Sequence, residues 1–296
     1  MDSFAVPVAE LDGACDLQAP RQQTMPVVFA SPHSGSNYPA DFVARSRLDA
    51  VALRKSEDSF VDEIFAGVIA QGAPLIRALF PRAYVDPNRE PFELDPAMFA
   101  DPLPDYANTR SPRIAAGLGT IARVVANGEE IYREKLRFAE VLERVNRLYR
   151  PYHEALEGLV QATERRFGLA VLIDCHSMPS IGGPMDEDAG RRRLDIVLGD
   201  CHGTSCAPAL TGLVEGFLAE RGYQVVLNNP YAGGFTTRHY GAPEAHVHAL
   251  QIEINRALYM NEATIERGRG LAQVGAHMAA LAAHLRERLP ALLPGD

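Results

Sequence analysis

The chain has 296 residues, of which 47% are hydrophobic and 23% charged, and its formal net charge at pH 7 is −9. These proportions are those of a globular protein with a substantial core, and they exclude a chain that is disordered by composition. The acidic balance argues against wide contact with nucleic-acid phosphates, which requires a clustered basic surface, so an anionic small substrate would need local arginines.

The sequence shows no targeting or membrane-spanning segment of the usual kinds. Residues 1–26 lack a basic start followed by an apolar stretch and a small-residue cleavage site. No apolar run approaches the roughly 18 residues that a bilayer span requires. The four cysteines are too few for a disulfide scaffold and form no CxxC pair. We therefore expect a cytoplasmic monomer or small homo-oligomer with reduced thiols and no membrane or nucleic-acid partner.

Short apolar runs bounded by turn residues predict the strands. Their β-branched content and near-continuous hydrophobicity suit strands that are buried on both faces. The expected strands cover residues 27–30, 75–80, 83–85, 169–173, 195–198, 224–227 and 248–254.

Between these runs, apolar residues spaced three and four apart predict helices over 49–71, 118–149, 151–167, 208–221 and 263–292. Pro151 should separate the second helix from the third, because proline breaks a helix interior but fits a first turn. Gly168 should cap the third helix before a strand. The polar, proline-rich span 87–112 predicts a long irregular excursion, and such loops are often functional.

The alternation of strands and helices predicts an α/β protein. We expect one domain, residues 1–296, built as a three-layer α/β/α sandwich around a parallel or mixed central sheet. In such folds ligands gather beyond the carboxyl ends of the strands.

Two histidines lie at such strand ends. Strand 27–30 runs into Ser31-Pro32-His33, and strand 169–173 runs into Asp174-Cys175-His176. Zinc suits a site of this kind, because neutral imidazole is a good ligand and catalytic zinc uses three protein ligands plus an open position. Another divalent transition metal is also possible.

A third ligand must then be a carboxylate. Glu57 and Asp58 lie in the polar part of helix 49–71, and either could reach the pocket. Asp58 is the preferred ligand and Glu57 the fallback. Asp174 points to the same face of its strand as His176, so it could orient that histidine or be a ligand itself.

Glu253 is the candidate general base. On strand 248–254 it shares a polar face with Gln251, because side chains alternate with period two. A carboxylate at a strand end could take a proton from the attacking water and deliver it to the leaving amine. The alternative is a purely structural ion pair with Arg256.

Two arginines are candidates for anion recognition. Arg89 follows Asn88 in a Pro-Asn turn, and Arg238 lies in a loop bounded by glycines. Guanidinium groups bind carboxylates in bidentate geometry, so two of them suit a dicarboxylate. Each could equally be an ordinary surface residue.

A serine hydrolase is the main competing chemistry. The stretch from Gly203 to Ala207 approximates a nucleophile elbow around Ser205, between a strand and a helix. His246 and His248 follow it, but no aspartate lies between Ser205 and them, so the triad is incomplete. A metal-carrying binding module would leave Glu253 and the arginines without a shared purpose.

The motifs together resemble the N-formylglutamate amidohydrolase family over about residues 27–260. The resemblance implies a phosphorylase/hydrolase-like fold related to zinc carboxypeptidases, and hydrolysis of N-formyl-L-glutamate to formate and L-glutamate in histidine breakdown. The segments that carry it are Pro32-His33-Ser34-Gly35, Val85-Asp86-Pro87-Asn88-Arg89, Asp174-Cys175-His176-Ser177, Thr237-Arg238-His239-Tyr240-Gly241 and residues 248–260.

Site roles follow from the resemblance residue by residue. It implies His33, Asp58 and His176 as metal ligands, Glu253 as base, Asn88, Arg89 and Arg238 as substrate-binding residues, and His239 and His248 for oxyanion stabilisation or substrate contact.

The sequence also departs from related patterns. Ser36 stands three residues after His33, where the carboxypeptidase relatives have a glutamate ligand. Pro87 and the stretch 93–96 point to a subgroup, whose substrate could be another N-acyl amino acid or a small peptide.

Overall fold

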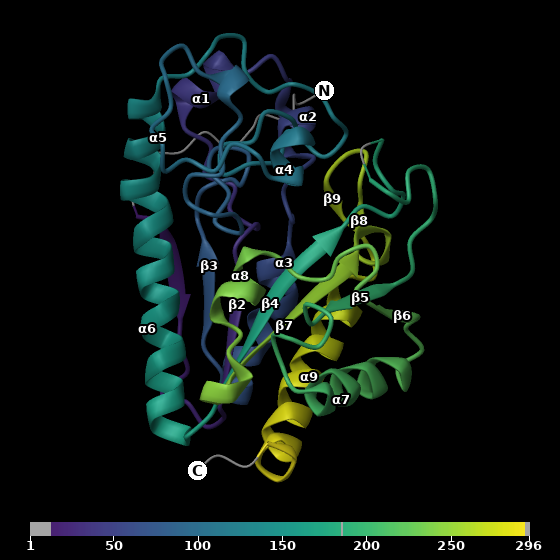
Figure 1. The fold of residues 1–296 in the computed structure, drawn as a ribbon. Coiled ribbons are helices and arrows are strands. Elements are labelled where there is room, and N and C mark those ends of the chain that lie inside the picture. The colour runs from purple at the N-terminus through teal and green to yellow at the C-terminus, as the bar shows by residue number, and fades with distance from the viewer. Residues whose placement is uncertain (1–12, 185, 294–296) are drawn as a thin grey trace.

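The computed structural model describes residues 13–184 and 186–293. Its centre is a mixed seven-stranded sheet of order β1-β3-β2-β4-β7-β5-β6 (Figure 1). Neighbours among β3, β2, β4 and β7 run parallel, whereas β1 joins β3 and β5 joins β7 in antiparallel fashion. The strands are β1 (Cys15–Gln18), β2 (Val27–Ser31), β3 (Leu75–Ala78), β4 (Ala170–Met178), β5 (Ile196–Gly199), β6 (Val225–Leu227) and β7 (Val247–Asn255). The predicted mixed sheet is confirmed.

Helices cover both faces of this sheet, which confirms the three-layer α/β/α sandwich. One layer contains α3 (Val61–Phe65), η1 (Ala66–Gln71), α7 (Pro208–Ala219) and α9 (Leu271–Leu292). The other contains α5 (Phe138–Arg144), η3 (Val145–Tyr149), α6 (Arg150–Phe167) and α8 (Phe235–Tyr240). Smaller elements are α1 (Ala40–Arg45), α2 (Ala50–Arg54), α4 (Pro112–Ala115), η2 (Pro96–Met98), η4 (Pro243–Ala245), η5 (Arg256–Leu258), β8 (Met260–Asn261) and β9 (Glu266–Arg267).

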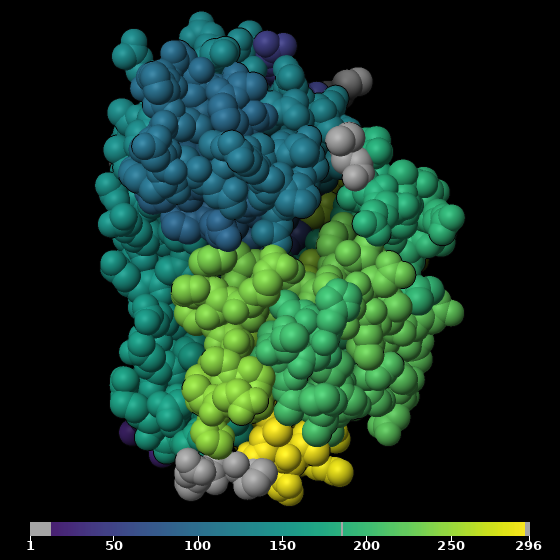
Figure 2. Space-filling model, in the orientation of Figure 1, coloured from purple at the N-terminus to yellow at the C-terminus, as the bar shows by residue number. Residues whose placement is uncertain are grey.

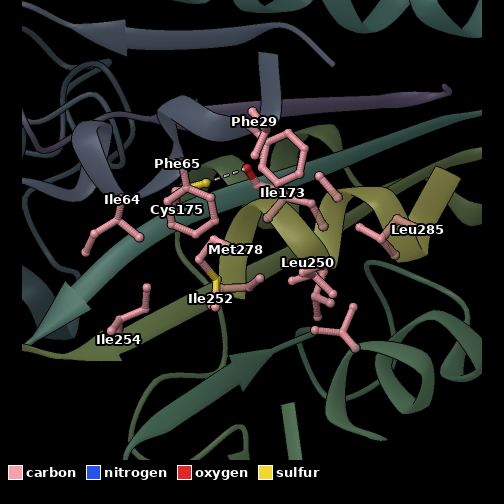
Figure 3. Packing of buried hydrophobic residues seen from close by; sticks show 14 of the residues in the cluster. Phe29, Ile64, Phe65, Ile173, Cys175, Leu250, Ile252, Ile254, Met278 and Leu285 are labelled. Atoms are coloured by element: carbon pink, nitrogen blue, oxygen red, sulfur yellow. Dashed lines mark hydrogen bonds between the residues drawn. The ribbon is translucent and has the colours of Figure 1, made fainter. Parts of the chain in front are cut away.

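The alternation of side chains along the central strands decides which face carries polar groups. Ile173 and Cys175 of β4 pack with Met278 of α9 in the core that Figure 3 shows. Successive strand residues point to opposite faces, so Asp174 and His176 belong to the other face. Asp174 contacts Thr237 of α8, whereas His176 contacts Asp58 and Asn88, which lie in irregular segments.

Two predicted elements at the site edge differ from the structure. Residues 83–85 form a turn rather than a strand. The predicted helix 49–71 is divided into α2, α3 and η1, because Phe60 adopts a left-handed conformation with φ of 69°. The irregular segment between α2 and α3 carries Glu57 and Asp58, so neither lies on a helix.

The predicted helix 118–149 is wrong over its first half. Residues 116–137 form turns and isolated bridges, including Phe99 with Leu136. Helix begins at Phe138 and continues past Pro151 without a break. A π-helical turn over 145–149 precedes the proline, with Arg150 N bonded to Val145 O, and this wider turn accommodates a residue that lacks an N–H.

Gly168 caps α6 as predicted, with φ of 68°. The last helix begins at Leu271, later than the predicted 263, and β1 was not predicted because its four residues have no long apolar run. Within 13–184 and 186–293, no helix is long and apolar enough to cross a membrane. The expected domain bounds, 1 and 296, and the first part of the segment 1–26 lie outside the described residues.

Candidate metal and catalytic site

His33 and His176 meet because their strands are parallel neighbours. β2 pairs with β4 over Val27 to Ala30, and both histidines follow toward the carboxyl ends. Their ring centroids are 4.7 Å apart. Asp58 joins them, and all three residues are buried, with one ligand atom from each within 4.8 Å of the others. The predicted metal-ligand group is therefore assembled in the fold.

The donor atoms of this group are Nδ1 of each histidine and Oδ2 of Asp58. This oxygen lies 3.1 Å from Nδ1 of His176 and 3.5 Å from Nδ1 of His33. Nδ1 of His33 is buried and has no hydrogen-bond partner among the described residues. A buried polar atom left without a partner is costly, and a metal ion would satisfy it. The donor set therefore fits a divalent metal.

A carboxylate lies behind each imidazole. Nε2 of His33 is 2.7 Å from Asp86 Oδ1, and Nε2 of His176 is 3.0 Å from Asp174 Oδ1. Asp86 forms a hydrogen bond with Nε2 of His33, and such an outer carboxylate holds the proton on the far nitrogen and leaves the near nitrogen free to bind metal. Asp174 Oδ1 forms no hydrogen bond with any described residue, although it lies close to His176. Asp174 lies on the Nε2 side of His176, away from Asp58, and it is not part of the group that could hold a metal. The side chain of Asn88 also contacts His176, at 3.1 Å from Nε2.

Asp58 is presented to the histidines by contacts on its other oxygen. Oδ1 accepts hydrogen bonds from Ser177 Oγ at 3.1 Å and from Arg256 Nη2 at 3.0 Å. Burial raises the pKa of Asp58, but His176 and His33 outweigh it and hold that pKa well below its usual value. Arg256 therefore pairs with Asp58 and not, in its described contacts, with Glu253.

Glu57, the fallback ligand, faces another partner. Arg54 binds its carboxylate in a bidentate manner, at 3.0 Å through Nε and 2.7 Å through Nη2. Ser59 and Tyr38 donate to the same carboxylate. These contacts satisfy Glu57 away from the histidines.

Glu253 lies beside His176, since the two residues are register partners in the parallel pair β4 and β7. It lines a cavity of about 130 Å³. In Figure 2 the surface is hollowed where the blue to teal segment that contains residues 82–128 meets the green segments. Burial, with the nearby charge of Asp58, raises the pKa of Glu253 to about 7 against the opposing effect of His176. A carboxylate with this pKa can accept and return a proton near neutrality.

The cavity has a cationic side and an apolar side. Arg89 lines it, and burial lowers the pKa of this guanidinium to about 10 because nearby acids compensate it only in part. Its Nε and Nη1 donate to the carbonyls of Leu118 and Asn88, each at 2.8 Å. The other arginines that line the cavity are Arg82 and Arg256, and the apolar side consists of Ala83, Ala116, Leu118, Ala122, Val124, Val125, Ala126 and Pro179.

Among the predicted site residues, Glu253 and Arg89 line this cavity, whereas the ligand group and Asn88 are buried beside Glu253 and are not among the lining residues. The other three predicted residues lie elsewhere. Arg238 and His239 are exposed on α8; Arg238 lines a separate pocket with Arg113, and His239 stacks on Phe235 at 4.7 Å between ring centroids. His248 lies at the start of β7, opposite Val171. At about 3.3 Å per strand residue, it is roughly 16 Å from Glu253. The structure gives His248 a different contact, since its Nδ1 accepts from Ala207 N at 3.1 Å.

The serine alternative finds no catalytic arrangement. Ser205 is buried, and its Oγ donates to the backbone oxygen of Ala249 at 2.8 Å. Its described contacts include no histidine and no carboxylate. The hydroxyl therefore satisfies a strand carbonyl and does not face the cavity.

Three residues that line the cavity were not predicted from the sequence. Asp86 lies inside a motif already singled out, two residues before Asn88, and that position was its only signal. Arg82 and Tyr231 line the cavity but carry no local pattern that would identify them. Their proximity to Glu253 comes from tertiary structure alone.

Comparison with known proteins agrees with these motifs. Residues 25–260 match the family model of N-formylglutamate amidohydrolase. The chain is 29% identical over 244 residues to N-formylglutamate deformylase from Pseudomonas putida, covering 81% of this chain and 84% of that one. It is 30% identical over 241 residues to N-formylglutamate deformylase from Pseudomonas aeruginosa, covering 80% of this chain and 83% of that one.

Solved structures give the same result. The crystal structure of N-formylglutamate amidohydrolase from Ralstonia eutropha JMP134 has a TM-score of 0.84 at 38% identity, covering 93% of this chain and 98% of that one. A gene product from Agrobacterium tumefaciens shares the fold, with a TM-score of 0.61 at 19% identity over 97% of this chain and 98% of that one. The chain belongs to the N-formylglutamate amidohydrolase family.

Proposed function

We propose that this protein is a metal-dependent amidohydrolase that converts N-formyl-L-glutamate and water to formate and L-glutamate. Family membership supports the substrate and the reaction type. The observation that carries the mechanism is the placement of Glu253 beside a buried group of two imidazole nitrogens and one carboxylate oxygen.

Zinc is the proposed metal, because it binds imidazole nitrogen and carboxylate oxygen and accepts three protein ligands at catalytic sites. His33, Asp58 and His176 would hold it. A divalent ion held there would polarise the substrate carbonyl and make water more acidic. Other divalent transition metals bind donor sets of the same kind.

Glu253 performs the proton transfers. As the water oxygen forms its bond to the formyl carbon, the carbonyl electron pair moves onto the carbonyl oxygen and one water proton passes to Glu253. That electron pair then re-forms the carbonyl as the C–N bond breaks and Glu253 returns the proton to the amine nitrogen, which leaves L-glutamate and formic acid, and the latter ionises to formate. Gln251 Nε2 donates to Glu253 Oε1 at 3.0 Å and fixes the orientation of the carboxylate.

Arg89 holds a substrate carboxylate inside the cavity. Among the described residues its Nη2 has no hydrogen-bond partner, so the guanidinium keeps donors for an anion. This contact places the amide carbonyl at reacting distance. Arg238, in the outer pocket with Arg113, attracts the anionic substrate toward the cavity. We assign no role to His239 or His248.

A second candidate substrate is another N-acyl amino acid or a small peptide. The apolar side of the cavity, mostly residues 116–126, favours it, because that side offers no partner to a second carboxylate. Turnover of N-formyl-aspartate, N-formyl-glutamine and N-acetyl-glutamate would separate the candidates. A place in histidine breakdown is a proposal that rests on the family resemblance, and cytoplasmic location is a proposal that rests on the sequence patterns and the cysteine usage described above.

The test is formate release from N-formyl-L-glutamate by the purified protein, before and after chelator treatment and with zinc restored. Activity should disappear with chelator and return with zinc, and His33→Ala should lose both metal and activity. If the zinc-bound protein releases no formate from N-formyl-L-glutamate, the substrate is another N-acyl amino acid. A protein that binds no metal would contradict the mechanism.

A further inference from the structure

The N–H groups of the cavity arginines are used to different extents. Arg256 donates from all three guanidinium nitrogens, to Ser177, Lys55 and Asp58. Hydrogen bonds on these three nitrogens fix the guanidinium in place. It therefore holds Asp58 and has little capacity left for a substrate.

Arg82 differs, because one nitrogen alone is bound. Its Nη2 donates to Asp86 Oδ2 at 2.7 Å, and neither Nε nor Nη1 bonds to any residue that the structure describes. The side chain lines the cavity that contains Glu253, with 20% of its surface exposed. An arginine has five N–H donors, so Arg82 keeps most of its donors for a ligand in this cavity.

The surroundings of Arg82 place it near the reacting groups. Asp86, which binds Arg82, also binds Nε2 of His33 through its other oxygen at 2.7 Å. Burial lowers the pKa of Arg82, but the charges of Asp86, Asp58 and Glu253 together raise it above its usual value. The positive charge thus lies close to both the ligand group and the base.

Arg89 has other neighbours. Besides Asp86 and Arg82, the charges that act on it are those of Arg113 and Glu93, which line the outer pocket. The two arginines line the same cavity and share Asp86, but the charge of Glu253 acts on Arg82, whereas those of Arg113 and Glu93 act on Arg89.

We infer that Arg82 is a catalytic residue whose free guanidinium N–H groups donate to the oxygen of the scissile carbonyl as that oxygen becomes negative. This inference rests on the proposed amide hydrolysis. The residues for which the resemblance implied this role, His239 and His248, both lie outside the cavity. A donor that is already fixed, as Arg82 is by Asp86, needs no reorganisation during the reaction.

The test compares Arg82→Ala and Arg82→Lys with Arg89→Ala as a matched control, because both alanine variants remove one cation from the same cavity. Loss of an oxyanion donor typically lowers kcat by about 100- to 1000-fold. Arg82→Ala should show this loss with zinc content, KM and inhibition by L-glutamate nearly unchanged, and Arg82→Lys should recover part of it. Arg89→Ala should instead raise KM and weaken inhibition by L-glutamate.

Other results would overturn the assignment. If saturating zinc restores kcat in Arg82→Ala, the residue acts only through Asp86 and His33. If KM rises while kcat is unchanged, Arg82 binds a ground-state carboxylate.

A second measurement does not depend on turnover. N-phosphoryl-L-glutamate carries anionic oxygens on a tetrahedral centre, and Arg82→Ala should bind it at least about tenfold more weakly than the wild type, with equal affinity for L-glutamate. Equal affinity of both proteins for this analogue refutes the inference. If the wild type hydrolyses no N-acyl amino acid, the proposed function is refuted instead. The affinity of Arg82→Ala for N-phosphoryl-L-glutamate then still tests whether Arg82 binds a negatively charged oxygen at this position. Arg82→Lys serves in the same titration if the alanine variant fails to fold.

Discussion

Glu253→Gln should abolish turnover while leaving metal content intact. Glutamine keeps the shape of the side chain and can still accept the hydrogen bond from Gln251, but it cannot take a proton from water. Loss of a positioned general base typically costs about 100- to 10,000-fold in rate. Glu253 is not in the ligand group, so zinc content should equal that of the wild type.

The same substitution should stabilise the metal-free protein at alkaline pH. The pKa of Glu253 rises from its usual 4.5 to about 7 on folding, chiefly through burial. At about 1.4 kcal/mol for each pH unit, this difference corresponds to about 3 kcal/mol. The folded state binds the carboxyl proton of Glu253 more tightly than the unfolded state does. The stability that this proton contributes is therefore complete below pH 4.5 and is lost as the pH rises through about 7. Glutamine avoids that loss.

Formate release and urea unfolding of the metal-free proteins measure the two effects. The free energies of unfolding should coincide near pH 4 and differ by about 3 kcal/mol in favour of Glu253→Gln above pH 8. A variant that keeps one tenth or more of wild-type kcat would remove Glu253 from the mechanism. The 8% exposure of Glu253 indicates that its carboxylate is desolvated. Equal free energies of unfolding for the wild type and the variant at pH 8.5 would contradict this.

Three further perturbations test the surrounding structure. Asp86→Asn removes the charge behind His33 and should weaken metal affinity by about 10- to 100-fold in a chelator competition; unchanged affinity would exclude an orienting role. Gly234→Ala would place a Cβ 2.2 Å from the amide of Asn88, so thermal unfolding should show a destabilisation of about 1 to 3 kcal/mol, and an unchanged Tm would mean that Asn88 moves freely. Arg238→Ala should lower kcat/KM at low salt, with the difference closing near 1 M salt, where charges are screened within about 3 Å; a salt-independent difference would point to direct contact.

Local sequence identified those parts of the site that depend on strands alone. The buried apolar runs of β2 and β4 are continuous in the sequence, so the positions of His33 and His176 at their carboxyl ends could be predicted. The position of Glu253 on a polar face could be predicted because side chains alternate between the two faces along β7. These inferences need only the strand period, which local patterns encode, whereas the neighbouring order of β2, β4 and β7 came from the structure.

The remaining parts depend on contacts between distant segments. The apolar spacing in 118–149 is that of a helix, but part of residues 116–128 lines the cavity, and long-range bridges such as Phe99 with Leu136 hold the segment in place. Arg238 and His239 share a motif with strong family resemblance, yet α8 directs both to solvent. No local pattern distinguishes an arginine such as Arg82, which lines the cavity, from one on the surface.

His176 and Glu253 are register partners on the neighbouring strands β4 and β7. These two residues proposed for the reaction therefore lie on different segments from those proposed to bind the rest of the substrate. Main-chain hydrogen bonds of two central strands set the distance between the proposed ligand histidine and the proposed base. Most residues that line the cavity come instead from irregular segments between residues 82 and 128. Insertions and substitutions there can change which acyl amino acid fits without shifting the reacting groups, so relatives with new substrates can arise while the hydrolytic centre stays intact.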